Sequence, residues 1–478
     1  MIADLKPYPA MKNSGVPWLG EVPEHWNMER AKWLFRKMDR PVRDADEVVT
    51  CFRDGTVTLR KNRRVRGFTE SLKELGYQGI RRGDLVIHAM DAFAGAIGVA
   101  DADGKGTPVY SVCEPTSTAN AQFYAYTVRE MARSQWIQAL AKGIRERSTD
   151  FRFEGFGSQA VPLPPLPEQA AIVQFLDHED RRIRRYIRAK QKLIKLLEEQ
   201  KQAIIHRVVT RGLDPNVRLK PSGVEWLGDV PEHWEVRTLG QLAGSFRTGP
   251  FGSILHQSEY VEGGTPIVNP THMRDGRVVA ESKCSVPPSV AQRLSNYALE
   301  VDDVVFSRRG ELGRCALVRD HESGWICGTG SMRVRINYVD LEPEYLIRVL
   351  QVRWVGEYLS LFSVGATMES LNTGILKGVP VLLPPVAEQR KIVEATARMT
   401  EVLRQAADDA QREITLLREY RTRLIADVVT GKLDVREAAA GLPDEAEEPE
   451  PLDEAEALAN AEDAMADDLD TELQEAEA

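Results

Sequence analysis

The chain has 478 residues, 42% of them hydrophobic and 28% charged, which is ordinary for a globular protein of about two to four domains. No run approaches the roughly 18–20 apolar residues that a membrane span needs, and the start, MIADLKPYPAMKNSG, has no apolar signal-peptide core. We therefore expect a cytoplasmic protein that does not associate with membranes.

The cysteines follow no ligand or disulfide pattern. They form no CxxC pair and no Cys/His spacing typical of a metal site, and their number is odd. We expect free thiols and no bound metal. The five positions are Cys51, Cys113, Cys284, Cys315 and Cys327.

The net charge of −10 averages two unlike parts of the chain. From Glu437 to the last residue there are 17 acidic residues and no Lys or Arg. Without those 17, the 62 basic residues exceed the remaining 55 of the 72 acidic ones by 7. This mild surplus permits nucleic-acid binding without requiring it.

Two similar segments begin the two halves of the chain. SGVPWLGEVPEHW at 14–26 returns as SGVEWLGDVPEHW at 222–234, a shift of 208 positions. These PEHW segments read as a loop and a strand with large apolar anchors. We expect each to pack as the edge where a globular domain begins, and the alternative is direct contact with a ligand. The anchors are Trp18, Trp26, Trp226 and Trp234.

The interiors that follow the PEHW segments, about 28–162 and 236–382, barely match each other. Helix spacing predicts helices within 121–140 and 343–359. Short apolar runs broken by Gly, Asp and Pro predict strands at 84–90, 95–100, 303–307 and 314–318. The fold class expected is α+β, with mixed α/β domains at 1–165 and 214–385.

Each interior ends in a second repeated segment. LPPLPEQ at 163–169 returns as LPPVAEQ at 383–389, and VVTRGLD at 208–214 returns as VVTGKLD at 428–434; both shifts are 220 positions. We call the first pair the EQ segments. The sequence between each EQ segment and the matching VVT segment has helix spacing and no Gly or Pro.

These helical stretches predict a coiled coil. Alternating steps of four and three from Ile183 and from Leu403 reach apolar residues at six and seven of eight positions. We expect two long helices, 166–213 and 386–434, that pair antiparallel. Lys201 and Arg421 take equivalent positions in the seam, where they either set the register or extend their charged ends to solvent.

The last segment, 435–478, consists mainly of Ala, Glu, Asp and Pro. Such a composition buries too little apolar surface to offset the entropy of ordering. We expect a disordered acidic tail that aids solubility, or else one that competes with DNA for the basic surface.

Several catalytic motifs are missing together. There is no GxxxxGK[ST] loop, no Gly-rich dinucleotide fingerprint, no GxSxG and no carboxylate pair followed by Lys at nuclease spacing. The Asp/Asn-Pro-Pro-aromatic tetrad of amino-methyltransferases is approached only at residues 269–272, which fail at two of four positions. We expect a non-catalytic chain that binds no cofactor itself.

What remains is a set of basic and polar loops suited to DNA. Arg can bind guanine, and Asn adenine, through paired hydrogen bonds, whereas Lys and Arg on phosphates add affinity without sequence information. For any one cluster the alternative is an ordinary solvated surface. The DNA-binding residues we predict are Arg63, Arg64, Arg66, Lys142 and Arg145 in the first domain, and Arg247, Asn269, Thr271, Arg308, Arg309 and Arg314 in the second.

In its PEHW segments, EQ segments and long helices ending in VVT, the chain resembles the specificity subunit of a type I restriction–modification system over residues 12–434. GDLVIHAMDAFAGAIGVA at 83–100 is also similar to a segment of that family's target-recognition domains. The acidic tail is not part of the family pattern.

The resemblance implies two target-recognition domains, each reading one half of a split, asymmetric site in double-stranded DNA. The helices would set the spacer and dock two modification subunits, which would carry S-adenosylmethionine and methylate adenine N6. Restriction subunits would add cleavage driven by ATP with Mg. Two alternatives stay open: a complex that only methylates, and a coiled-coil scaffold that binds proteins.

Overall fold

The computed structural model describes residues 5–63, 76–140, 150–224, 227–250, 254–279, 281, 283–310, 312–363 and 371–443. The chain forms two compact units: Met1–Arg188 with Ile414–Ala478, and Ala189–Glu413. Each unit therefore contains a globular part with half of each long helix, so the unit boundaries fall inside the predicted helices. No described helix is long and apolar enough to cross a membrane.

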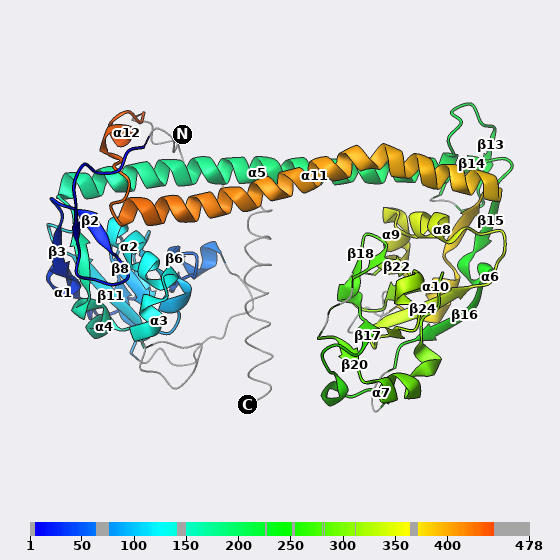
Figure 1. The fold of residues 1–478 in the computed structure, drawn as a ribbon, viewed down its shortest axis with the longest axis horizontal. Coiled ribbons are helices and arrows are strands. Elements are labelled where there is room, and N and C mark those ends of the chain that lie inside the picture. Colours follow the sequence, from blue (N-terminus) through cyan, green and yellow to red (C-terminus); the bar gives the residue numbers. More distant parts are fainter. Residues whose placement is uncertain are drawn as a thin grey trace. The chain divides into compact units, whose positions relative to one another are not determined.

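The first unit is built on a four-stranded antiparallel sheet in the order β4-β11-β8-β9, of which β8 and β11 are labelled in Figure 1. Helix α2 packs against β8 and β9. Its elements are β1 Met11–Asn13, β2 Glu21–Pro23, β3 Asn27–Arg30, α1 Ala31–Leu34, β4 Phe35–Lys37, β5 Val49–Cys51, β6 Val57–Leu59, η2 Arg60–Asn62, β7 Gln78–Ile80, β8 Leu85–His88, η3 Ala92–Ala94, β9 Ile97–Val99, β10 Gly104–Gly106, β11 Tyr110–Pro115, α2 Ala121–Arg133, α3 Trp136–Leu140, α4 Phe153–Ser158 and β12 Ala160–Leu163.

The second unit repeats this sheet as β16-β24-β21-β22, again antiparallel, and adds the three-stranded sheet β20-β17-β23. Interiors that barely match in sequence thus share one topology. Its elements are β13 Leu219–Pro221, β14 Asp229–Pro231, β15 Glu235–Thr238, α6 Leu239–Leu242, β16 Ala243–Thr248, η5 Gln257–Glu259, β17 Thr265–Val268, η6 Pro270–His272, β18 Met273–Arg274, β19 Arg277–Val278, β20 Ser285–Val286, α7 Pro288–Arg293, η7 Ser295–Tyr297, β21 Val304–Ser307, β22 Cys315–Leu317, η8 Asp320–Glu322, β23 Ile326–Cys327, β24 Ser331–Ile336, α8 Pro343–Leu350, α9 Arg353–Phe362, α10 Thr373–Lys377 and β25 Pro380–Leu383.

Both sheets are buried on two faces, which explains their continuous apolar strands. In β8, Leu85 and Ile87 enter the core shared with α2, and Val86 enters a separate cluster on the opposite face. In β21, Val304 and Phe306 enter one core, while Val305 enters another. The four predicted strands are confirmed as β8, β9, β21 and β22.

The two predicted interior helices are each broken in two. The first ends as α2, because Gln135 takes the left-handed conformation with φ of +60°; α3 follows. The second ends as α8, and Val352 then adopts extended backbone with ψ of 139° before α9 begins. Val352 is buried in the core of the second unit, so packing overrides the helix pattern there.

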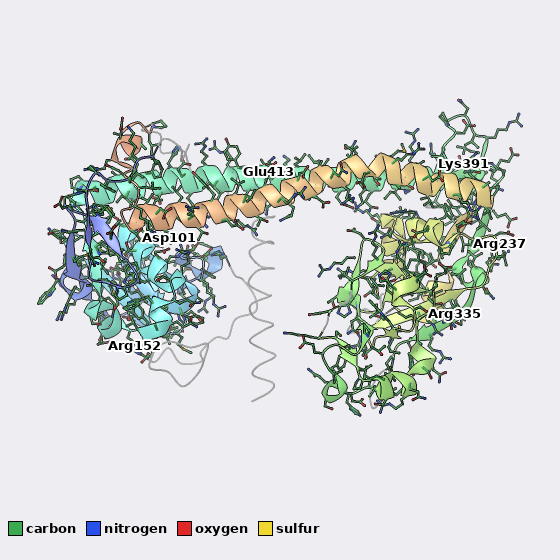
Figure 2. The ribbon with its side chains drawn as sticks, viewed as in Figure 1. Asp101, Arg152, Arg237, Arg335, Lys391 and Glu413 are labelled. Carbon is green, nitrogen blue, oxygen red and sulfur yellow. The ribbon has the colours of Figure 1, made fainter. Side chains whose placement is uncertain are left out.

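The long helices are α5, Leu166–Arg211, and α11, Val386–Val429 (Figure 1). Every predicted seam residue is buried or partly buried, which confirms the seam. Ion pairs link the two helices: Arg421 binds Asp180 in the first unit, and Lys190 lies 2.6 Å from Glu413, labelled in Figure 2, in the second. Because residues early in α5 pair with residues late in α11, the helices are antiparallel.

The two seam cations have different roles. Arg421 of α11 forms an ion pair with Asp180 of α5, and this pairing is suited to fix the register of the two helices. Lys201 pairs with Glu198 of its own helix at 2.9 Å and lies 3.9 Å from Asp275.

A buried glutamine joins each long helix to its globular part. The amide oxygen of Gln169 accepts a hydrogen bond from the backbone N–H of Asn120 at 2.8 Å. Its amide nitrogen donates to the carbonyls of Thr118 at 3.1 Å and Pro164 at 2.9 Å. Gln169 thereby links the first turn of α5 to the loop that starts α2.

The second EQ segment repeats this joint. Gln389 accepts from the backbone N–H of Glu342 at 2.9 Å and donates to the carbonyls of Asp340 and Pro384, both at 2.8 Å. Both glutamine side chains are fully buried. Three hydrogen bonds per side chain explain why each EQ segment ends in glutamine.

The preceding glutamate binds the PEHW segment, but the two copies differ. Glu168 is buried and accepts hydrogen bonds from Tyr8 at 2.6 Å and from the indole of Trp26 at 2.9 Å, and it pairs with His25 at 2.8 Å. The burial of Tyr8 itself, and next its hydrogen bond to Glu168, raises the pKa of the Tyr8 hydroxyl.

In the second copy, Glu388 pairs with His233 at 2.7 Å. Trp234 is fully buried like Trp26, but its indole N–H has no hydrogen-bond partner among the residues that the structure describes. The prediction that the tryptophans pack as anchors is confirmed for Trp26 and Trp234, whereas Trp226 lies outside the described residues.

The predicted acidic tail begins too early at 435. Val435 and Ala439 are buried in the core of the first unit, and Arg436–Ala440 forms the short helix α12. Arg436 pairs with Asp434 at 2.6 Å and lies over the ring of Tyr8. These apolar and aromatic contacts order a segment that composition alone assigns to the tail; residues 444–478 lie outside the described part.

Replacing Gln389 with alanine is expected to lower the free energy of unfolding by about 3 kcal/mol, because three buried backbone groups lose their partner. Chemical denaturation measures this change. Gln405→Ala on the same helix is the control, since Gln405 is exposed and bonds only Glu401, and it should have almost no effect. Equal effects of the two substitutions would contradict the assigned joint.

The two tryptophans offer a matched pair of substitutions. Trp26→Phe removes an indole N–H that binds a buried carboxylate, whereas Trp234→Phe removes one without a partner among the described residues. We expect Trp26→Phe to be the more destabilising by roughly 1–2 kcal/mol, since hydrogen bonds to charged groups are the stronger class. The same loss in thermal or chemical denaturation would show that the Glu168 contact contributes nothing.

Candidate nucleic-acid interface

In the second unit, the predicted DNA-binding loops meet at one end of the four-stranded sheet. Because the strands are antiparallel, the ends of β16 and β21 lie beside the starts of β24 and β22. Backbone bonds tie these loops together: Gly249 N–H to the carbonyl of Ser331 at 3.0 Å, and Arg308 N–H to that of Gly330 at 2.8 Å. The sequence does not reveal this convergence.

The loop between β21 and β22 carries three of the predicted arginines. Arg309 is exposed, whereas Arg308 is half-buried and donates to the carbonyl of Leu371 at 3.4 Å. Arg314 donates to the carbonyl of Pro270 at 3.4 Å. Arg309 is thus the best placed of the three to reach a ligand.

Asn269 and Thr271 lie at η6, next to this loop. The side chain of Asn269 caps η6 and donates to Sγ of Cys284 at 3.2 Å. A Cβ added at Gly328 would lie 2.1 Å from Oδ1 of Asn269, so only glycine fits there. Asn269 therefore shapes the loop, and its contact with a base stays a prediction; Thr271 is exposed.

Arg247 lies on β16 opposite Arg333 of β24, and its guanidinium donates to the carbonyl of Asn296 at 3.3 Å. Burial, and then the charge of Arg335, lowers the pKa of Arg333. Arg335, labelled in Figure 2, makes two 2.9 Å bonds to buried Asp303. Arg335 also pairs with Glu300 at 2.6 Å, so two carboxylates balance much of the arginine charge on these strands.

A cleft of about 930 Å³ in the second unit adds residues that the sequence analysis missed. It joins the predicted Thr271 and Arg314 to Arg274 and Arg353, and Gln202 of α5 also lines it. Arg274 closely follows the predicted Asn269 and Thr271 in the chain, whereas nothing in the helix pattern around Arg353 marks that residue as part of a site.

In the first unit the structure describes only one of the five predicted residues. Arg63 follows η2, donates to Asp54 at 2.7 Å and lies over the ring of Phe52. Burial opposes the ionised form of Asp54, but the N–H of Thr56 and the charge of Arg63 hold its pKa below the usual value. Four predicted residues lie outside the described part: Arg64, Arg66, Lys142 and Arg145.

The cysteines are free thiols, and four of the five are buried. Burial raises the pKa of Cys315 and of Cys327 to about 12, which keeps both protonated near neutral pH. Among the described residues, no group of three or more His, Cys, Asp or Glu side chains is placed to hold a metal ion.

Residues 231–404 match the family model described as the type I restriction modification DNA specificity domain. The specificity subunit of the type I restriction enzyme MjaVIII from Methanocaldococcus jannaschii is 21% identical over 318 residues, covering 66% of this chain and 70% of that protein. The EcoBI specificity subunit of Escherichia coli is 22% identical over 258 residues, 53% of each chain.

A chain from a solved structure of a type I restriction–modification system has the same fold, with a TM-score of 0.58 at 18% identity. The match covers 86% of this chain and 99% of that one. The residues that match the DNA specificity domain lie in the second unit, and both units are built on a four-stranded sheet. The chain is therefore similar to type I restriction enzyme specificity subunits, and it shares the fold of a chain from a type I restriction–modification system.

Replacing the exposed Arg309 with alanine is expected to relax recognition of one half of the DNA site by about 1–3 kcal/mol, the usual contribution of one paired arginine–base contact. Competition binding with duplexes altered in one half-site measures this. Arg237→Ala is the control, because Arg237 lies on β15 and is held by Glu235 and Tyr338. Unchanged discrimination by the Arg309 variant would remove this residue from the interface.

Proposed function

We propose that this chain is the DNA-reading, non-catalytic subunit of a type I restriction–modification complex, and that each unit reads one half of a bipartite target. The observation that carries the proposal is that the two units repeat the same architecture but differ in the loops at the ends of their sheets. The two units share a sheet order and a glutamine joint, yet the loops at corresponding sheet ends carry different side chains. Two readers with unlike contacts favour an asymmetric target.

The paired helices would set the spacing between the half-sites and bind two modification subunits. Large apolar side chains of the long helices that stay outside the seam would supply apolar contacts for such docking. In the first unit Tyr186 and Leu416 are exposed. In the second unit the exposed apolar residues of the helices are Leu193, Leu196, Met399 and Val402.

In this proposal the chemistry belongs to other chains. The modification subunits would bind S-adenosylmethionine and methylate adenine N6 in cytoplasmic DNA, and restriction subunits would use ATP and Mg to translocate and cleave it. This chain would recognise the DNA target sequence through base contacts from its loops, and would add affinity through phosphate contacts from Lys and Arg.

Sequencing of methylated adenines in cells that contain this chain and its modification subunits is expected to give a bipartite motif with a fixed gap and unlike halves. Exchanging residues 236–382 for those of another family member should change one half and leave the other half and the gap unchanged. A continuous palindromic motif, or a change in both halves after the exchange, would refute the proposal.

A further inference from the structure

The first unit contains a cleft of about 350 Å³ between α2, the loop that follows β8, and the second half of α11. Four arginines from three separate parts of the chain line it: Arg53, Arg129, Arg133 and Arg421. None of these belongs to the residues that the sequence analysis selected for DNA binding.

Three of the four arginines have a carboxylate partner. Arg53 pairs with Asp91 at 3.3 Å, and Arg421 pairs with Asp180 across the helices. Arg133 makes two bonds to Glu130, at 2.6 and 2.5 Å. Their charges are therefore largely balanced within the unit.

Arg129 differs from these three, because it makes no hydrogen bond or ion pair with any residue in the described part of the chain. Burial, and next the like charge of Arg421, lowers the pKa of Arg129, while Asp54 and Asp180 attract it only at longer range. A guanidinium stays charged even so, and Arg129 is half-buried at the wall of the cleft. The cleft thus holds a cation that has no ion-pair partner among the described residues.

The backbone around Arg129 makes room for its guanidinium. A Cβ at Gly55 would lie 2.5 Å from Nη1 of Arg129, and Gly55 has a φ of +89°. The positive φ favours glycine at this position, and the missing side chain lets the guanidinium lie against the tip of the β5–β6 hairpin. Gly95, with a φ of +92°, shapes the other side of the same cleft.

We propose that this cleft is an oxyanion site in which Arg129 binds a phosphate group. A planar guanidinium with several N–H donors matches the oxygens of a phosphate, and an incoming anion would supply the counterion that Arg129 lacks. Two sources carry this chemistry: a phosphodiester of bound DNA, which rests on the proposed function, and free inorganic phosphate.

The second unit has a cleft at the corresponding place, lined by Leu350, Gln351 and Gln202, but it has no counterpart of Arg129. The hydroxyls of Tyr124 and Tyr345 bind the carbonyls of Pro162 and Leu382, at 3.0 and 2.9 Å, which aligns α2 with α8 at a shift of 221 positions. At that shift, Arg129, Glu130 and Arg133 correspond to Leu350, Gln351 and Trp354. The phosphate contact through Arg129 would therefore belong to the first unit alone.

The first experiment tests for the site itself with inorganic phosphate as the probe. The melting temperature of the full chain is compared in phosphate and in chloride at equal ionic strength. The parent chain should melt higher in phosphate, and Arg129→Gln should lose that difference without melting lower in chloride. Arg423→Gln on α11, where Arg423 is exposed and pairs with Asp427, makes the same charge change outside the cleft and should keep it.

The second experiment identifies the source. For the full chain with its modification subunits, log K for the target duplex is plotted against log salt. Arg129→Gln should reduce the slope by about 0.9, the value for one phosphate contact, and leave half-site discrimination unchanged. Arg129→Lys retains the charge and should give a smaller reduction, which separates lost contact from misfolding.

Each outcome decides the proposal. A reduced slope assigns the site to DNA phosphate, with or without stabilisation by free phosphate. Stabilisation by phosphate with an unchanged slope assigns it to the free anion, and no effect in either experiment overturns the site. If the parent complex fails to discriminate DNA sequences, the proposed function fails, while the melting experiment still decides whether the cleft binds phosphate.

Discussion

The fold depends on a buried side-chain amide at the first turn of each long helix. Gln169 and Gln389 each bind three backbone groups, and together they hold helix, proline turn and interior helix in one geometry. A buried amide tolerates little change, because any lost bond leaves a desolvated polar group. The loops at the sheet ends have constraints of their own, such as the need for glycine at Gly328, but no buried amide shared by both units is described there. This difference explains a chain in which the joints repeat and the contents diverge.

The glutamate that precedes each joint glutamine has different contacts in the two units. Glu168 is enclosed by Tyr8, His25 and Trp26, whereas Glu388 keeps only the histidine contact among the described residues. The Tyr8 contact lies beside α12, so the segment after α11 closes the first unit through Arg436. Both glutamine joints keep one geometry, while the charged contacts around them differ between the two units.

Local pattern was sufficient to find the repeated EQ segments, the strands and the long helices, but not the hydrogen bonds of the two glutamines. The apolar run around Val86 needs no distant partner to be strand-like, and the seam that starts at Ile183 is visible in spacing alone. Local pattern failed where packing decides. It missed the helix breaks at Gln135 and Val352. It also assigned Val435 and the residues after it to the disordered tail, although Val435 is buried in the core of the first unit.

By itself, the sequence determined that two domains, each bounded by a PEHW and an EQ segment, are joined by two long helices with an apolar seam. Its motifs resemble those of type I specificity subunits. Only the tertiary structure decided which charged residues have partners, because ion pairs such as Arg421–Asp180 join positions far apart in the chain. It showed that Asn269 is occupied within its loop and that Arg129 is left without a counterion among the described residues. Composition counts charges, whereas function depends on which of them the fold leaves unbalanced.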